Sequence, residues 1–236
     1  GLNTAPQLKY NYADEVRGEI DIDKQNNIYI ATCTNSDDFP TKNSFQNNFK
    51  GDQEGCVIKM DNQLTQIIWS AYLGGSASDA IYSLAIDEND DLYVTGGTNS
   101  INFPTTLNAY QNSYQDSLNA DAFVTKISSG GGYILASSYF GTPHYDQSYF
   151  VEIGTTQEVY LFGQTKSNNN QMVYNSSYFV PGGGQFISVF DKDLTTILRS
   201  TTIGTGKGTP DISPTAFLVD VCDKIYIAGW GSNLGG

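Results

Sequence analysis

The segment Asp87-Glu-Asn-Asp-Asp91 places oxygen atoms at alternate positions, as the start of a calcium-binding loop does. Its candidate ligands are Asp87, Asn89 and Asp91. The segment lacks both the glycine at the sixth position and the closing glutamate at the twelfth position of such a loop. A hairpin turn rich in Asp and Asn explains the same residues, because these side chains hydrogen-bond to their own backbone. We therefore expect no cofactor, with calcium as the alternative.

Nucleophilic catalysis of the Ser-His-Asp or Cys-His type needs a histidine base, and His144 is the only histidine in the sequence. It lies in a polar segment beside Pro143, where a solvent-exposed position is more common than a catalytic one. One histidine and three scattered cysteines also exclude a zinc site of ordinary composition. A carboxylate pair for glycoside hydrolysis depends on distance in three dimensions, so the sequence leaves it open. We expect no catalytic residues, and a polysaccharide hydrolase is the least favoured alternative.

The three cysteines, Cys33, Cys56 and Cys222, contain no Cys-x-x-Cys pattern and are too few for a disulfide framework. Cys33 ends one predicted strand and Cys56 begins the next, so antiparallel pairing of these strands would bring the two residues close together. A Cys33–Cys56 disulfide is one interpretation. The other is a buried free thiol at Cys56, because this position aligns with Phe123 and Phe186 of later repeats.

One phrase of apolar residues around a tyrosine occurs four times at a nearly constant period. Its copies are residues 28–32, 92–96, 159–163 and 225–229. Each copy follows a shorter apolar segment across a polar turn, which predicts a β-hairpin. In the first three copies a long polar loop and two further apolar segments follow, so each period predicts four strands. Such a repeat is typical of β-propeller blades, and a β-sandwich or barrel is the alternative.

The fold class that we predict is all-β: a β-propeller with four-stranded blades, three of them whole and a fourth only begun. The predicted blades cover residues 14–73, 79–140, 146–203 and, incompletely, 211–236, in one domain. An open arc of blades leaves sheet faces in water, so we expect remaining segments of a longer chain to complete a larger ring. Residues 7–12 stand where a fourth strand would end, and we expect them to close the last blade.

An aspartate stands at a nearly constant distance before each tyrosine phrase, between one blade and the next. The four residues are Asp14, Asp79, Asp146 and Asp211. Such a carboxylate can accept backbone N–H bonds in the turn between blades, and we favour this structural interpretation. In the functional alternative, the same carboxylates surround the mouth of a central channel and contribute to a cation or ligand site.

The composition of the 236-residue chain limits its partners. Aromatic residues make up 13% of it, too many for a disordered chain. Its 12 Lys and Arg against 25 Asp and Glu give a formal net charge of −13, which excludes nucleic-acid binding by phosphate neutralisation and disfavours docking on anionic lipid. No apolar run approaches the length that spans a bilayer, so we expect no membrane insertion.

The second blade resembles the SBBP-type bacterial β-propeller repeat, which is found in large secreted surface proteins. The resemblance is carried by residues 72–79, 92–100, 103–105 and 121–127. The first blade keeps the Phe-Pro-Thr sequence at residues 39–41. The third blade lacks this sequence, so we expect its long loop to have diverged.

Residues 228–236 are similar to a stretch of Bacteroidetes surface proteins, in which such propellers precede PKD-like modules and a signal for the type IX secretion system. The resemblance implies an extracellular or cell-surface location, in an adhesin or in a protein associated with gliding motility. It implies no catalytic residues.

The long loops after the tyrosine phrases are rich in Asn, Ser and Gln and carry Phe49, Tyr110 and Tyr114. Aromatic rings among amides suit recognition of a protein or glycan surface. They equally suit loops that fold over the blade edge and bury their own rings. We expect a noncatalytic scaffold for adhesion or protein interaction, with a lectin-like, glycan-binding propeller as the alternative.

Overall fold

The computed structural model describes residues 2–115 and 118–231, which form four separate antiparallel sheets. The first sheet contains β1 (Glu19–Ile22), β2 (Ile28–Thr34), β3 (Glu54–Met60) and β4 (Ile67–Leu73). The second contains β5 (Asp79–Ile86), β6 (Leu92–Thr98), β7 (Asp121–Ile127) and β8 (Ile134–Phe140). The third contains β9 (Asp146–Ile153), β10 (Val159–Thr165), β11 (Gln185–Phe190) and β12 (Ile197–Ile203). The fourth contains β13 (Ile212–Val219) and β14 (Ile225–Gly231).

Within each sheet the strands neighbour one another in chain order. The all-β prediction is confirmed for the described residues, whose other regular elements are short 3-10 turns. Three four-stranded sheets followed by a two-stranded one are consistent with a β-propeller-like fold. Residues 232–236, the end of the predicted fourth blade, lie outside the described residues. None of the helical turns in the described ranges is long and apolar enough to cross a membrane.

The first hairpin of every sheet closes with the same turn. At one position in this turn the backbone has a positive φ of 55° to 64°, a conformation that Asn and Asp adopt more readily than most side chains. The residues at this position are Asn26, Asp90, Gln157 and Asp223. Their backbone N–H groups donate to the carbonyl oxygen three residues earlier, which fixes the turn and therefore the register of the hairpin.

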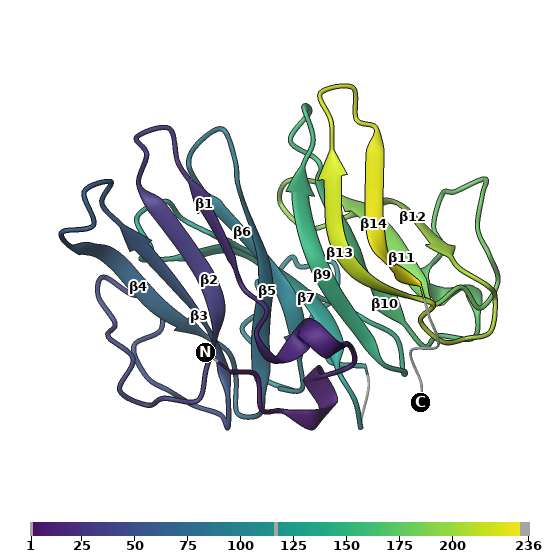
Figure 1. Cartoon of the computed structure of the whole chain (residues 1–236), viewed down its shortest axis with the longest axis horizontal. Coiled ribbons are helices and arrows are strands. Elements are labelled where there is room, and N and C mark those ends of the chain that lie inside the picture. Colours follow the sequence, from purple (N-terminus) through teal and green to yellow (C-terminus); the bar gives the residue numbers. More distant parts are fainter. Residues whose placement is uncertain (1, 116–117, 232–236) are drawn as a thin grey trace.

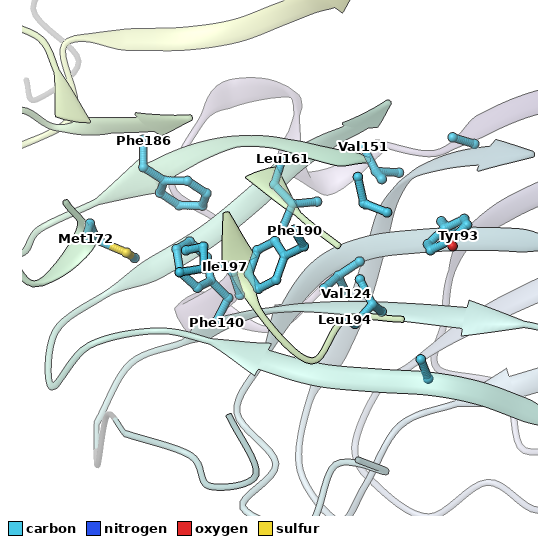
Figure 2. Packing of buried hydrophobic residues seen from close by; sticks show 14 residues of the cluster. Tyr93, Val124, Phe140, Val151, Leu161, Met172, Phe186, Phe190, Leu194 and Ile197 are labelled. Atoms are coloured by element: carbon cyan, nitrogen blue, oxygen red, sulfur yellow. The ribbon is translucent and has the colours of Figure 1, made fainter. Parts of the chain in front are cut away.

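Apolar side chains fill the space between neighbouring sheets, and the second sheet is buried on both faces. Trp69 and Val57 of the first sheet share a buried cluster with Phe123 and Ile127 of the second. Between the second and third sheets, Phe140 of β8 lies against Phe186 and Phe190 of β11 (Figure 2), with ring centroids 5.2 and 5.3 Å apart. A smaller cluster joins the third sheet to the fourth.

The first strands of the sheets lie next to one another: β5 contacts β1 and β9, and β9 contacts β13. We call these four the inner strands. The sheets follow one another in chain order around the inner strands. The turns near the N-terminus, drawn in purple, lie beside β5 (Figure 1). This radial order brings residues from distant parts of the sequence together at the inner strands.

The long loop after the second strand of each complete sheet folds back over that sheet's outer strand. Lys42 exchanges backbone hydrogen bonds with Ser70 of β4, and Tyr174 exchanges them with Ser200 of β12. In the second sheet the Thr106 N–H donates to the carbonyl oxygen of Ser137 in β8. Each loop therefore covers an edge strand that would otherwise be open to pairing with another chain.

The prediction that residues 7–12 form a closing strand is wrong. The structure has the 3-10 turns η1 (Pro6–Leu8) and η2 (Tyr12–Glu15) instead. Pro6 lacks the N–H that a strand ladder needs and suits the first position of a helical turn. The carboxylate of Asp14 accepts the N–H groups of Tyr10 and Asn11, which therefore cannot pair with a neighbouring strand.

Candidate functional site

Two of the four aspartates between the blades, Asp79 and Asp146, are the first residues of inner strands and are fully buried. Asp79 accepts hydrogen bonds from the Gly75 N–H at 2.8 Å, from the Ser100 hydroxyl at 2.9 Å and from the Thr98 hydroxyl. Burial raises the pKa of Asp79 to about 7, against the opposing effect of these donors. Its acceptor oxygens thus hold the turn from β4 to β5 together with the start of the loop after β6.

Asp146 and Asp211 have matching partners in the next two turns. The N–H and hydroxyl of Thr142 donate to Asp146 at 2.6 and 2.8 Å, and burial raises the pKa of Asp146 well above its usual value. The N–H and hydroxyl of Thr205 donate to Asp211 at 2.7 and 2.6 Å. Asp79, Asp146 and Asp211 thus each accept a backbone N–H bond in the turn between two sheets, which is the structural role that the sequence suggested for them.

Asp14 is also buried, but it lies in η2 and not at the start of a strand. Its Oδ2 accepts from the N–H groups of Tyr10 at 2.8 Å and Asn11 at 2.7 Å, and from the hydroxyl of Tyr149 in β9 at 2.9 Å. Burial outweighs these donors and the nearby Arg17, so that the pKa of Asp14 is raised. Asp14 therefore connects the N-terminal segment, residues 2–17, to the third sheet.

Further buried hydrogen bonds join the N-terminal segment to the inner strands. The hydroxyl of Tyr82 in β5 donates to the Leu8 carbonyl at 2.5 Å and accepts from the Asn3 amide at 3.0 Å and from the Gln147 amide at 3.1 Å. The rings of Tyr82 and Tyr149 are stacked, with centroids 5.2 Å apart. This cluster was not expected from the sequence, although both tyrosines stand three residues after an inner-strand aspartate.

Carboxylates from two inner strands also lie near one another. Glu152 of β9 is partly buried, and burial together with the charges of Glu19 and Asp21 of β1 raises its pKa to about 7. Glu19 accepts the backbone N–H of Leu84 at 2.8 Å. In the part of the chain that the structure describes, no group of three or more His, Cys, Asp or Glu residues could hold a metal ion.

A lysine lies where the sequence suggested a calcium ion. Oδ1 of Asp87 accepts the N–H groups of Asn89 at 2.8 Å and Asp91 at 2.9 Å, and Oδ2 lies 2.9 Å from the ammonium of Lys126. The same ammonium lies 3.6 Å from Asp91 and 5.0 Å from the ring centroid of Tyr93. An internal cation therefore compensates part of the negative charge of the turn.

A tyrosine, a cation and a carboxylate also meet in the other two complete sheets. In the first sheet the cation lies opposite the tyrosine on the third strand, as in the second, whereas in the third sheet it comes from the outer strand β12 and Val189 is opposite the tyrosine. In the first, Lys59 lies 4.7 Å from the Tyr29 ring centroid and 2.9 Å from Asp23. In the third, the members are Tyr160, Arg199 and Glu158, with 5.5 Å between guanidinium and ring and 2.5 Å between guanidinium and carboxylate. We call these groups the tyrosine–cation clusters. The sequence signal was a Lys three residues after Cys56 and after Phe123.

The two candidate disulfide partners, Cys33 and Cys56, are free thiols in the structure, and both are buried. Cys56 is opposite Thr32 in the ladder, whereas Cys33 is opposite Gly55. This offset of one residue directs the two side chains toward opposite faces of the sheet. Burial raises the pKa of Cys33 to about 11 and that of Cys56 to about 12, so both stay protonated at neutral pH. Cys222 is exposed in the β13–β14 turn.

His144 lies partly buried in the turn before β9, where its backbone N–H donates to the Thr142 hydroxyl at 3.3 Å. The three loop aromatics that suggested ligand recognition all contact other rings. Phe49 lies 5.7 Å from Tyr72, Tyr110 lies 5.5 Å from Phe190, and Tyr114 lies 6.1 Å from Tyr139. These rings pack against the sheets.

A cavity of about 490 Å³ opens at the loop end of the first two sheets. Its lining is polar and apolar in about equal parts, and its polar residues include Gln7, Asp52, Ser78, Asn99 and Asn119. The amide side chains that line the cavity can hydrogen-bond to a small polar ligand.

The repeated sheets, their aspartate-bonded turns and their tyrosine–cation clusters define a β-propeller-like protein. A sequence model of the SBBP β-propeller repeat family matches residues 68–104. The match extends from β4 through β5 and β6 into the following loop. No curated protein matches the chain.

Proposed function

We propose that the chain is a noncatalytic scaffold of a cell-surface protein, which presents its loops for adhesion or protein interaction. The observation that carries the proposal is that the sheets and their turns recur, whereas the long loop after β10 is held differently from the loops after β2 and β6. The hairpin turns and aspartate-bonded turns recur from sheet to sheet. The loops after β2 and β6 each bond a tyrosine hydroxyl of the outer strand, whereas the loop after β10 bonds Thr202. A rigid frame with variable loops is a common architecture for binding.

The proposed location is extracellular, through type IX secretion, with a role in adhesion or gliding motility. It rests on the resemblance of residues 228–236 to a stretch of Bacteroidetes surface proteins and on the resemblance of the repeats to those of large secreted surface proteins. The net charge of −13 favours a soluble surface that repels nucleic acid and anionic lipid.

We also propose that further segments of the same polypeptide complete the ring. Both ends of the arc expose apolar side chains. Val16, Ile20 and Ile22 are 66%, 64% and 52% exposed at the first sheet, and Tyr226 and Trp230 are 55% and 72% exposed at the fourth. Soluble proteins seldom leave such faces in water, and another blade would cover each of them.

Binding of the labelled chain to bacterial cells, extracellular proteins and polysaccharides tests the scaffold function. The loop after β6 presents Ile101 and Leu107, which are 76% and 91% exposed. The double variant Ile101→Ser, Leu107→Ser should lose saturable binding, whereas Leu64→Ser, at the opposite end of the sheets, should keep it. Equal binding by both variants contradicts loop recognition. Release of sugars from any polysaccharide contradicts a noncatalytic role.

A glycan-binding function is the second candidate, favoured by the amide-lined cavity. Sugar hydroxyls can hydrogen-bond to the side-chain amides of Gln7 and Asn99, which line the cavity. A glycan array probed with the whole chain should then show hits that Asn99→Ala loses and Asn112→Ala, an exposed residue of the same loop, retains.

A further inference from the structure

The fourth sheet ends at an open edge. In each complete sheet the second strand has a partner on both sides, as β6 has in β5 and β7. β14 is paired with β13 on one side, and no strand of the described residues lies on the other. Its backbone N–H and C=O groups on that side are available to an added antiparallel strand.

The fourth sheet has the tyrosine and the carboxylate of a tyrosine–cation cluster, Tyr226 and Asp220, but no cation in contact with both of them in the described residues. Tyr226 occupies the place of Tyr93, and its hydroxyl donates to Asp220 at 3.1 Å. Tyr226 is 55% exposed, whereas Tyr93, which lies beside Lys126 and packs against the third sheet, is 1% exposed. In the described residues no Lys or Arg lies over the Tyr226 ring. A ring and a carboxylate side by side favour a cation supplied from the open side.

A groove lies behind this edge, on the face of the third sheet. It has a volume of about 310 Å³, and its apolar lining is Ile187, Val189 and Ile225 of β14. Arg199 and the polar residues at 175–177, 200 and 201 line the rest of it. At the corresponding place between the first two sheets, Phe123 and Ile127 of β7 pack against the first sheet. The groove is therefore where apolar side chains of a strand added to β14 would insert.

The ladder between β6 and β7 gives the register of such a strand. In that ladder Lys126 is opposite Tyr93 and Phe123 is opposite Gly96. In β14 the matching positions are Tyr226 and Gly229. An aromatic residue and a cation three positions apart point to opposite faces of a strand, one into the groove and one toward the Tyr226 ring.

We propose that the β14 edge and the groove on β11 and β12 form one docking site for an antiparallel β-strand from a further segment of the same polypeptide. The strand carries an aromatic or large aliphatic residue opposite Gly229 and a Lys or Arg opposite Tyr226, within reach of Asp220. This inference rests on the proposed completion of the ring and adds the chemistry that selects the completing strand.

A synthetic hairpin that copies residues 119–141, and thus β7 and β8, tests the site on the whole 236-residue chain. Trp230 of β14 is 72% exposed and Trp69 is fully buried, so a change in tryptophan fluorescence reports on the edge. The hairpin contains no tryptophan. We expect saturable binding, and the hairpin with Lys126→Glu should bind about five- to tenfold more weakly because it loses the ring and carboxylate contacts.

Matched variants of the chain locate the contact. Asp220→Asn removes the charge and keeps an oxygen for the N–H groups of Cys222 and Lys224, so the turn should fold, as thermal unfolding verifies. The Asp220→Asn chain should prefer the unchanged hairpin, with Lys126, over the Lys126→Glu hairpin less strongly than the wild-type chain does. Asp37→Asn, an equal charge change on an exposed loop, should leave that preference intact.

Equal binding of the Lys and Glu hairpins, or no binding of either, would overturn the proposed site. Undiminished binding of a Phe123→Ser hairpin would overturn the role of the groove. Dimerisation of the chain through β14, measured by light scattering without peptide, would replace the proposed occupant by a second copy. If the chain binds the hairpin but no cell, protein or polysaccharide, only the adhesion function is refuted. If the chain binds such a surface partner but not the hairpin, only the docking site is refuted.

Discussion

Lys126 illustrates how much one side chain can connect in this protein. Its ammonium contacts two carboxylates of the β5–β6 turn and the ring of Tyr93, and it comes from β7. Desolvation lowers its pKa, but the hydrogen bonds and charges of Asp87 and Tyr93 outweigh this effect and raise the pKa overall. Lys126 therefore stays charged and holds a turn against the strand next to it.

Replacing Lys126 by methionine keeps most of the side-chain volume and removes the charge. Asp87 is 3% exposed at its side chain and loses its counter-ion, so we expect a loss of about 1 to 3 kcal/mol in the free energy of unfolding. Urea denaturation measures it. The control is Lys207→Met, at an exposed loop position. Equal losses in both variants would show that the cluster adds nothing beyond a surface charge.

The raised pKa of Glu152 leads us to expect that the free energy of unfolding depends on pH. Its pKa is raised from 4.5 to about 7 in the folded chain, which therefore keeps a proton that the unfolded chain releases between these values. The contribution of Glu152 thus makes the wild type less stable as the pH rises through this window. Glu152→Gln should be more stable than the wild type by about 1 to 2 kcal/mol at pH 7.5 and nearly equal to it at pH 4.5.

Denaturant unfolding at both pH values measures this difference. Glu88→Gln, on an exposed turn, changes the net charge equally and should show no such pH dependence. Parallel stability profiles of the wild type and Glu152→Gln between these pH values would contradict the raised pKa.

At the scale of elements, the loops after β2 and β6 are attached to the outer strands by tyrosine hydroxyls. Tyr139 of β8 donates to the Ser100 carbonyl at 2.6 Å and accepts the Phe103 N–H at 2.9 Å. Tyr72 of β4 does the same with Ser36 and Phe39. Phe103 itself packs on Phe123, with centroids 4.3 Å apart. The Phe-Pro-Thr sequence is thus part of the architecture.

Tyr139→Phe removes only the hydroxyl. It leaves the Ser100 carbonyl and the Phe103 N–H with only their mutual hydrogen bond of 3.2 Å, so we expect a loss of about 0.5 to 1.5 kcal/mol and faster amide hydrogen exchange at Phe103. Tyr133→Phe serves as the control, because Tyr133 is 74% exposed. Unchanged exchange at Phe103 would show that ring packing alone holds the loop.

The strands were predictable from sequence because the pattern that defines them is local. The tyrosine phrases coincide with β2, β6, β10 and β14, and their turns contain residues that tolerate a positive φ. The placement of Cys33 and Cys56 was not predictable, because it depends on an offset of one residue in the ladder. The positions of the loop rings were left open for a different reason. Tyr110 packs against Phe190, far along the chain, and is still 42% exposed.

At the scale of the whole molecule, the N-terminal segment joins sheets that are separate in sequence. Leu8 and Asp14 bond to Tyr82 of the second sheet and Tyr149 of the third. Arg17 donates to the Pro214 carbonyl of the fourth sheet at 2.8 Å. No local pattern marks residues 7–12 for this role, since their partners lie many strands away, and the sequence analysis accordingly placed them in a strand.

Leu8→Ala tests whether this segment contributes to global stability. Leu8 is fully buried, so its truncation should reduce the free energy of unfolding by about 2 to 4 kcal/mol. Leu2→Ala, at a position 61% exposed, is the control and should have little effect. Urea denaturation compares the two. A Leu8 variant as stable as the control would indicate that the segment detaches without loss to the sheets.

The stacked pair Tyr82 and Tyr149 has a mechanical consequence. Both rings stand on inner strands, and both hydroxyls bond to the first residues of the chain. A pulling force on those residues is thus divided between two sheets before it reaches any single hairpin. The N-terminal attachment therefore distributes tension over two sheets where a free tail would bear on one.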